Sequence, residues 1–268
     1  MEHPRFFVGN VAALAAVDIA NAFRKAPPPF TAQLPDAAAA HMRVLRLSAG
    51  DAVTLFDGLG GEFNATVSDI DKKTGHVDVL AHTSIERESP LQVVVVQALA
   101  VGDKMDWIVQ KASELGATQI VPVLTERCTL RLSGERAMKR VAHWQQVALA
   151  ASEQCGRNRV AQLAPISDFA RWLASVEPHC GNYFVLHPQG QSATLVDALA
   201  TLSIRNTAAQ RLPLHILIGP EGGLSPAEVR AAEAAGIVAV RLGPRVLRTE
   251  SAAAAALAVI GAIVGDLR

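Results

Sequence analysis

The chain has 268 residues, 50% of them hydrophobic, and carries 25 Lys and Arg side chains against 25 Asp and Glu side chains. A chain of this length can bury a sizeable core, as one large domain or two small ones, without disulfide or metal staples. The zero net charge removes bulk charge as an argument for polynucleotide binding, although local charge can still provide one.

The cysteines indicate the cellular compartment of the protein, and the longest apolar run indicates whether it contacts a membrane. Cys128, Cys155 and Cys180 are odd in number and widely spaced, with no C-x-x-C pair and no metal-ligand spacing to a histidine. We therefore expect reduced thiols, no metal site and a cytoplasmic location. The longest apolar run, Ala252–Val264, is too short to span a bilayer and is typical of a buried helix, so we expect no membrane contact.

The first 75 residues contain short runs of apolar and β-branched residues that are separated by turn-forming segments. Strands are expected at His41–Leu47, Val53–Phe56, Glu62–Val67 and His76–Leu80. The separating segments 57–61 and 71–75 are rich in Asp and Gly and are typical of hairpin turns. This pattern predicts a small β-barrel over residues 1–75, followed by a linker over residues 76–90.

Beyond residue 90 the hydrophobic period changes. Leu91–Ala98 is a continuous apolar run typical of a strand buried on both faces, and Lys104–Leu115 has apolar residues at helical spacing. Further strands are expected at Ile120–Leu124, Phe184–Leu186, Leu214–Ile218 and Ile237–Val240, and further helices at 134–154, Pro226–Ala235 and Ser251–Val264. Alternating strands and helices predict an α/β domain with a parallel sheet over residues 91–268.

A basic segment, Arg127–Val160, carries seven Lys and Arg side chains and only two acidic ones. Local positive charge of this kind suits phosphate recognition, although a solvated helix face explains it equally well. Near its end, Arg157 and Arg159 could clamp a phosphate. Glu153 could accept a proton, or it could form an ordinary i,i+4 pair with Arg157.

Two loops near the C-terminus carry Gly and Pro directly after predicted strands: Ile218–Gly223 (IGPEGG) and Leu242–Glu250 (LGPRVLRTE). Strands that end in glycine turns and open helices expose backbone N–H groups, and parallel α/β sheets bind ligands at that edge. The loops therefore predict one pocket built largely from main chain. Glu221 is either an acid or base there, or a loop carboxylate that accepts backbone N–H bonds. Ser225 and Glu228 predict a capping box for the helix that follows.

The same loops also argue against two common classes of ligand. Neither contains the G-x-G-x-x-G or the G-x-x-x-x-G-K-S/T pattern, so dinucleotide and nucleoside triphosphate binding lose support.

Thr249 is the expected N-cap of the last helix.

Taken together in this order and spacing, the motifs resemble the ribosomal RNA small subunit methyltransferase E family of the SPOUT superfamily. The matching stretches are Pro4–Phe6, His41–Arg46, Gly102–Asp106, Gln110–Gly116, Glu126–Cys128, Glu153–Arg157 and the two glycine loops. The resemblance implies a PUA-like β-barrel for RNA docking, followed by an α/β domain with a deep trefoil knot. It also implies a homodimer that uses S-adenosylmethionine to methylate N3 of a uridine in the 16S rRNA of the small ribosomal subunit.

The resemblance further implies the site residues. The cofactor bed would be Leu186, Ile218, Gly219, Gly223, Leu242, Gly243, Val246, Leu247 and Thr249. The catalytic candidates are Glu153 and Glu221 as the base, and Arg157 and Arg248 as stabilisers of the developing anion. RNA contacts are expected from Arg5, Arg43, Arg46, Arg131, Arg157 and Arg159.

Three other functions stay open at this point. One is a knotted methyltransferase that acts on another RNA nucleotide, such as a tRNA 2′-O position. Another is a non-enzymatic RNA-binding assembly protein, for which the intact glycine loops are unfavourable. The third is a small-molecule enzyme with a doubly wound α/β fold.

Overall fold

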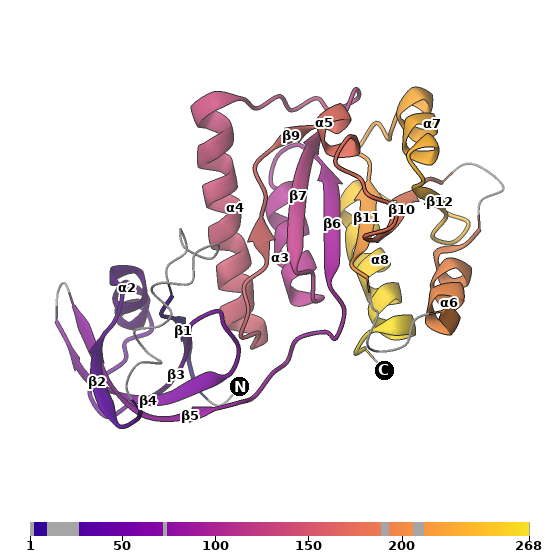
Figure 1. The fold of residues 1–268 in the computed structure, drawn as a ribbon. Coiled ribbons are helices and arrows are strands. Elements are labelled where there is room, and N and C mark those ends of the chain that lie inside the picture. Colours follow the sequence, from indigo (N-terminus) through magenta and orange to yellow (C-terminus); the bar gives the residue numbers. More distant parts are fainter. Residues whose placement is uncertain (1–2, 10–26, 72–73, 189–192, 206–211, 268) are drawn as a thin grey trace. The chain divides into compact units, whose positions relative to one another are not determined.

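The computed structural model describes residues 3–9, 27–71, 74–188, 193–205 and 212–267. Contacts divide the chain into two compact units (Figure 1). The first unit comprises residues Met1–Glu88 and Ser152–Val160, and the second comprises Ser89–Ala151 and Ala161–Arg268. Each unit has its own sheet.

The first unit is built on a five-stranded sheet in the order β1-β3-β4-β5-β2. Its strands are β1 (Arg5–Phe7), β2 (Phe30–Gln33), β3 (Ala52–Phe56), β4 (Glu62–Ile70) and β5 (Gly75–Thr83). Neighbouring strands are antiparallel except β1 and β3, which are parallel. The hydrophobic core includes the fully buried side chains of Phe6, Leu55 and Val77. The strand β5 continues to Thr83, into the first half of the segment expected to be a linker.

The strand predicted at His41–Leu47 is wrong, because the structure has helix α2 there, at Asp36–Val44. The helix contains a run of four alanines, the residue with the highest helix propensity, after an acidic residue in the first turn. Ala38, Ala39 and Met42 lie at helical spacing and are buried in the core of this unit. The apolar residues after Met42 gave a local alternation that the alanine run overrides.

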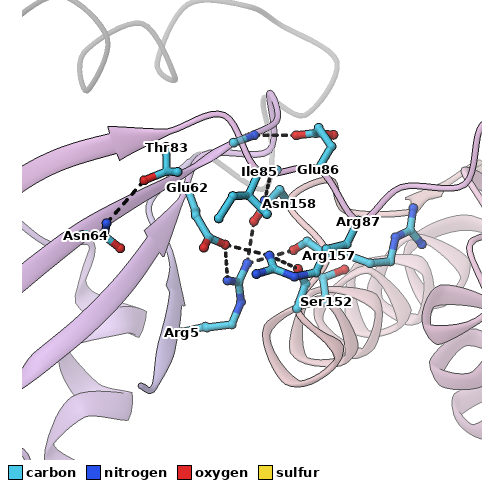
Figure 2. A network of polar contacts seen from close by, with 12 residues as sticks. Arg5, Glu62, Asn64, Thr83, Ile85, Glu86, Arg87, Ser152, Arg157 and Asn158 are labelled. Carbon is cyan, nitrogen blue, oxygen red and sulfur yellow. Dashed lines mark hydrogen bonds and ion pairs between the residues drawn. The ribbon is translucent and has the colours of Figure 1, made fainter. Parts of the chain in front are cut away.

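A buried polar network fastens the segment Ser152–Val160 to the sheet of the first unit (Figure 2). Arg5 on β1 donates to the Glu62 carboxylate over 2.7 Å and to the Asn158 side-chain oxygen over 2.6 Å. The Asn158 amide donates in turn to the Ile85 carbonyl over 2.6 Å. Because these partners are far apart in sequence, no local sequence pattern predicts their hydrogen bonds.

The second unit contains a seven-stranded sheet in the order β12-β10-β11-β6-β7-β8, with β9 pairing with β7. The strands are β6 (Val93–Ala98), β7 (Gln119–Leu124), β8 (Gln162–Leu163), β9 (Ser167–Asp168), β10 (Asn182–Leu186), β11 (Leu214–Ile218) and β12 (Val238–Val240). Every recorded pair is parallel, which confirms the predicted α/β architecture. Buried Val93–Ala98 lies inside the sheet, as its continuous apolar run predicts.

Six helices accompany this sheet in the described part of the chain. They are α3 (Lys104–Glu114), α4 (Gly134–Cys155), α5 (Phe169–Leu173), α6 (Leu195–Arg205), α7 (Pro226–Ala234) and α8 (Thr249–Val264). The α4 helix starts in the second unit and its last turn belongs to the first. The apolar α8 packs against α3, α6 and β11. None of the helices that the structure describes is long and apolar enough to cross a membrane.

Candidate active site

A pocket of about 430 Å³ opens where three neighbouring parallel strands end. Leu186 closes β10, Ile218 closes β11, and Leu242 follows β12 by two residues. This is the carboxyl edge of the sheet, where parallel α/β folds bind ligands. The volume falls within the range of small-molecule and cofactor sites.

The structure brings all of the predicted cofactor residues to this one pocket. Its lining includes Leu186, Ile218, Gly219, Gly223, Leu242, Gly243, Val246, Leu247 and Thr249. Glu221 and Arg248 line it too. What these residues bind stays a prediction, but their convergence from three loops shows that the two glycine motifs build one site.

Glycine is required in both loops because of the backbone. Gly223 and Gly243 have positive φ angles of 67° and 73°, a region that side chains disfavour. At Gly219 an added Cβ would lie 3.0 Å from the Leu224 backbone nitrogen. A side chain there would distort its own loop before it filled the pocket.

Thr249 ties the last helix to the pocket wall. Its hydroxyl donates to the Gly219 carbonyl over 2.7 Å and accepts from the Gln97 side-chain amide over 2.9 Å. The N-cap position of α8 is occupied by Arg248 without a side-chain cap bond, so the cap role predicted for Thr249 is wrong. Its buried hydroxyl instead joins α8, the loop after β11 and strand β6.

The predicted capping box at the start of α7 is confirmed, and its glutamate, Glu228, also accepts a hydrogen bond from another loop. Ser225 accepts from the Glu228 backbone N–H, and Glu228 accepts from the Ser225 N–H over 2.8 Å. The other Glu228 oxygen accepts from the Glu126 backbone N–H, also over 2.8 Å. Glu228 therefore links the loop after β7 to the pocket loop after β11.

Glu221 is held by an ion pair that the sequence did not reveal. One of its oxygens accepts from the Lys104 ammonium over 2.9 Å and from the Val101 backbone N–H over 3.1 Å. Burial alone would raise the pKa of Glu221, but the hydrogen bond from Lys104 and the backbone donors outweigh it and lower the pKa. Glu221 is therefore an ionised carboxylate at neutral pH and a weak base.

The other two catalytic candidates, Glu153 and Arg157, belong to the first unit and do not line the pocket. Glu153 accepts from the Phe7 backbone N–H over 3.0 Å, and burial raises the pKa of its carboxyl despite that bond. Arg157 is buried and pairs with Glu88 over 2.6 Å. The i,i+4 pair of Glu153 with Arg157 that the sequence also offered stays a prediction.

The arginines expected to contact RNA fall into two groups. Arg5 and Arg157 are buried in polar contacts of the first unit (Figure 2). Arg46, Arg131 and Arg159 are exposed, and Arg43 is half-buried. Only the second group presents guanidinium groups at a surface in the described structure.

Two pocket arginines, Arg127 and Arg245, were not singled out from the sequence as site residues. Arg127 follows β7 within the Glu126–Cys128 motif, and Arg245 follows Pro244 in the second glycine loop, so both positions after strand ends offered a signal. Among the residues that the structure describes, no cluster of three or more His, Cys, Asp or Glu side chains could hold a metal ion.

Comparison with known proteins adds the following similarities. Residues 87–261 match the model of an RNA methyltransferase domain, and residues 34–80 match that of an RNA methyltransferase PUA domain. A Bacillus subtilis protein named ribosomal RNA small subunit methyltransferase E is 31% identical over 219 residues, which cover 82% of this chain and 84% of that protein.

Two solved structures are similar over the whole of both chains. A ribosomal RNA small subunit methyltransferase E from Neisseria gonorrhoeae, bound to S-adenosyl methionine, is 33% identical with a TM-score of 0.85. A methyltransferase from Legionella pneumophila, in complex with the bound cofactor SAM, is 32% identical with a TM-score of 0.84.

Proposed function

Because the chain belongs to the RNA methyltransferase family of the ribosomal RNA small subunit methyltransferase E proteins, we propose that it methylates N3 of a uridine in 16S rRNA with S-adenosylmethionine as the methyl donor. The observation that carries this proposal is the pocket at the ends of β10, β11 and β12, which gathers the whole predicted cofactor bed. The substrate would be the small ribosomal subunit.

The pocket residues fit this cofactor. Apolar side chains such as Leu186, Ile218 and Leu247 suit an adenine ring, and the backbone groups of both glycine loops suit its polar edges. The positive φ of Gly223 and Gly243 keeps these loops in a shape that other residues disfavour. When bound, the cofactor supplies an electrophilic methyl group on a sulfonium.

Catalysis would consist of positioning the uridine and stabilising its anion. The N3–H of uridine is a weak acid, and in-line attack depends strongly on placement of the acceptor. Arg248 lines the pocket, so we propose that it stabilises the charge that develops on N3 and O4. Glu221 is a weak base because Lys104 holds it as a carboxylate, so we assign the larger contribution to the arginine. Glu153 is the second candidate for the base, and Arg157 is the second candidate for anion stabilisation.

The two units would have different functions. We propose that the first unit docks the RNA through exposed arginines such as Arg46 and Arg159, and that the second unit transfers the methyl group. We also propose that the glycine loops form a trefoil knot. The protein would act as a homodimer in the cytoplasm. The domain limits proposed from the sequence are 1–75, 76–90 and 91–268.

Methyl transfer from labelled S-adenosylmethionine to small ribosomal subunits that lack the modification tests the proposal. Nucleoside mass spectrometry should find N3-methyluridine in the 16S rRNA. Methylation of another nucleotide would overturn the proposed position, and transfer without RNA would overturn the proposed substrate. A Gly223→Val variant should bind the cofactor at least tenfold more weakly, because valine is strained at that positive φ.

A further inference from the structure

The charged side chains that line the pocket do not balance. Arg127, Arg245 and Arg248 line it together with a single carboxylate, Glu221. That carboxylate is already paired with Lys104 over 2.9 Å. The pocket therefore presents an excess of positive charge in a chain whose formal net charge is zero.

Arg127 is held in place by the opposite loop. Its Nη1 donates to the Gly222 carbonyl over 3.1 Å, and an added Cβ on Gly222 would lie 3.2 Å from the Arg127 Cβ. The neighbouring Glu126 N–H is fixed by Glu228 over 2.8 Å. Because a guanidinium has five N–H donors, one bond to a carbonyl leaves the others available to a ligand. Arg127 is thus a pre-positioned cation at the pocket.

Arg245 and Arg248 reach the same pocket from the loop between β12 and α8. Both are exposed, and neither forms an ion pair with any residue that the structure describes. Arg245 follows Pro244, whose ring restricts the backbone of the turn. With Arg127 from the loop after β7, two separate loops therefore bring three guanidinium groups without a carboxylate partner to one opening.

The cofactor alone cannot neutralise these arginines. It carries one carboxylate against two cationic groups, the sulfonium and the ammonium. The single carboxylate of the cofactor can pair with only one of the three arginines, so at least two remain available to bind another anion. A phosphodiester matches the planar fork of a guanidinium, which donates two parallel hydrogen bonds to phosphate oxygens.

We propose that Arg127 and Arg245 hold a phosphate of the RNA strand beside the nucleotide to be methylated, and we call this pair the arginine rim. The inference rests on the proposed function and deepens it, because it names residues that place the substrate. The arginine rim leaves Arg248 for the reacting base. It also moves part of RNA recognition from the first unit to the pocket itself.

The experiment measures equilibrium binding to unmodified small ribosomal subunits over a range of salt concentrations. Arg127→Gln and Arg245→Gln are compared with the wild type and with Arg171→Gln, which removes an exposed arginine of α5 outside the pocket. The double variant, with both rim arginines replaced by Gln, should reduce the slope of log K against log salt by about 0.7, as expected for one lost phosphate contact, and each single variant should reduce it by part of that amount. Each should also bind about tenfold more weakly at moderate salt. The Arg171→Gln variant should match the wild type.

Calorimetry with S-adenosylmethionine separates RNA contact from cofactor contact. Both rim variants should bind the cofactor within about twofold of the wild type, since the rim holds RNA and not the cofactor. A large loss of cofactor affinity would overturn the inference, as would unchanged salt slopes or an equal change in Arg171→Gln. If the wild type transfers no methyl group but the slopes differ as stated, the proposed reaction fails and the arginine rim stands. If N3-methyluridine forms but the slopes are unchanged, the reaction stands and the arginine rim fails.

Discussion

Glu153 lies in the last turn of α4, and its carboxylate is mostly shielded from solvent. One oxygen accepts from the Phe7 N–H, and the other lies 3.7 Å from the His41 ring. Burial raises the pKa of this carboxyl, which means that folding favours its protonated form. Such a group contributes stability below the pKa that it has in the unfolded chain, and that contribution is lost as the pH rises through its folded pKa.

The Glu153→Gln variant should therefore gain stability relative to the wild type as the pH rises. Glutamine keeps an oxygen for the Phe7 N–H but carries no charge to bury. The difference in unfolding free energy, variant minus wild type, should increase between about pH 4 and pH 7 in denaturant titrations. Glu135→Gln, which changes an exposed acid on the same helix, should show no such trend. A difference that falls with pH would contradict the assignment, and unchanged turnover would remove Glu153 as the base.

At the scale of the element, the first turn of α8 is where the pocket is anchored. Thr249 joins that turn to the Gly219 carbonyl and to Gln97, a fully buried side chain of β6. A single hydroxyl therefore joins the first turn of a helix, the loop directly after β11 and the last-but-one residue of β6. A loop made largely of glycines needs such an anchor because its own side chains cannot fix it.

Replacing Thr249 by Val should loosen this anchor while keeping the volume of the side chain. The half-buried Gly219 carbonyl would lose its donor and the buried Gln97 amide would lose an acceptor, which costs about 1–3 kcal/mol of unfolding free energy. S-adenosylmethionine should also bind more weakly, since the carbonyl belongs to the pocket loop. Thr249→Ser, which keeps the hydroxyl, is the matched control for calorimetry and denaturant titration. Equal cofactor affinity in the two variants would show that the hydroxyl does not organise the pocket.

The elements and contacts of the second unit and helix α2 show which features could be predicted from the sequence and which could not. The strands β6, β7, β10, β11 and β12 and the capping box at Ser225 were predictable because their patterns are local and strong, whereas the two-residue strands β8 and β9 were not predicted. The helix α2 was missed because an alanine run resembles neither an amphipathic helix nor a strand. The Lys104–Glu221 pair was invisible, because its partners lie 117 residues apart and only the assembled sheet edge brings them together.

At the scale of the whole molecule, the first unit is discontinuous in sequence. Residues Ser152–Val160 belong to it although more than sixty residues of the second unit precede them. Their attachment depends on Arg5, whose guanidinium also lies 5.1 Å from the centre of the Phe56 ring. Arg5 and Arg157 were predicted to contact RNA, but charge alone cannot distinguish an arginine that contacts RNA from one that pairs with a buried carboxylate.

Arg5→Gln should destabilise the protein without affecting the pocket. Breaking a buried ion pair costs about 3–5 kcal/mol, and the remaining contact of Arg87 with Glu62 should reduce this to about 2–3 kcal/mol. Arg159→Gln removes a largely exposed pair with Glu86 and should cost less than about 1 kcal/mol. Denaturant titration measures both, and S-adenosylmethionine affinity should stay at the wild-type value in both. Similar costs for the two variants would show that the network does not hold the first unit together.

The discontinuity of the first unit has a consequence for the order of synthesis. Arg5 leaves the ribosome 153 residues ahead of Asn158, the amide that completes its contacts. At about 5–20 residues per second, this interval lasts roughly 8–30 s. During that time the nascent N-terminal sheet carries an arginine without its amide partner. The first part of the chain to be made is therefore unable to finish folding until much of the second part has emerged.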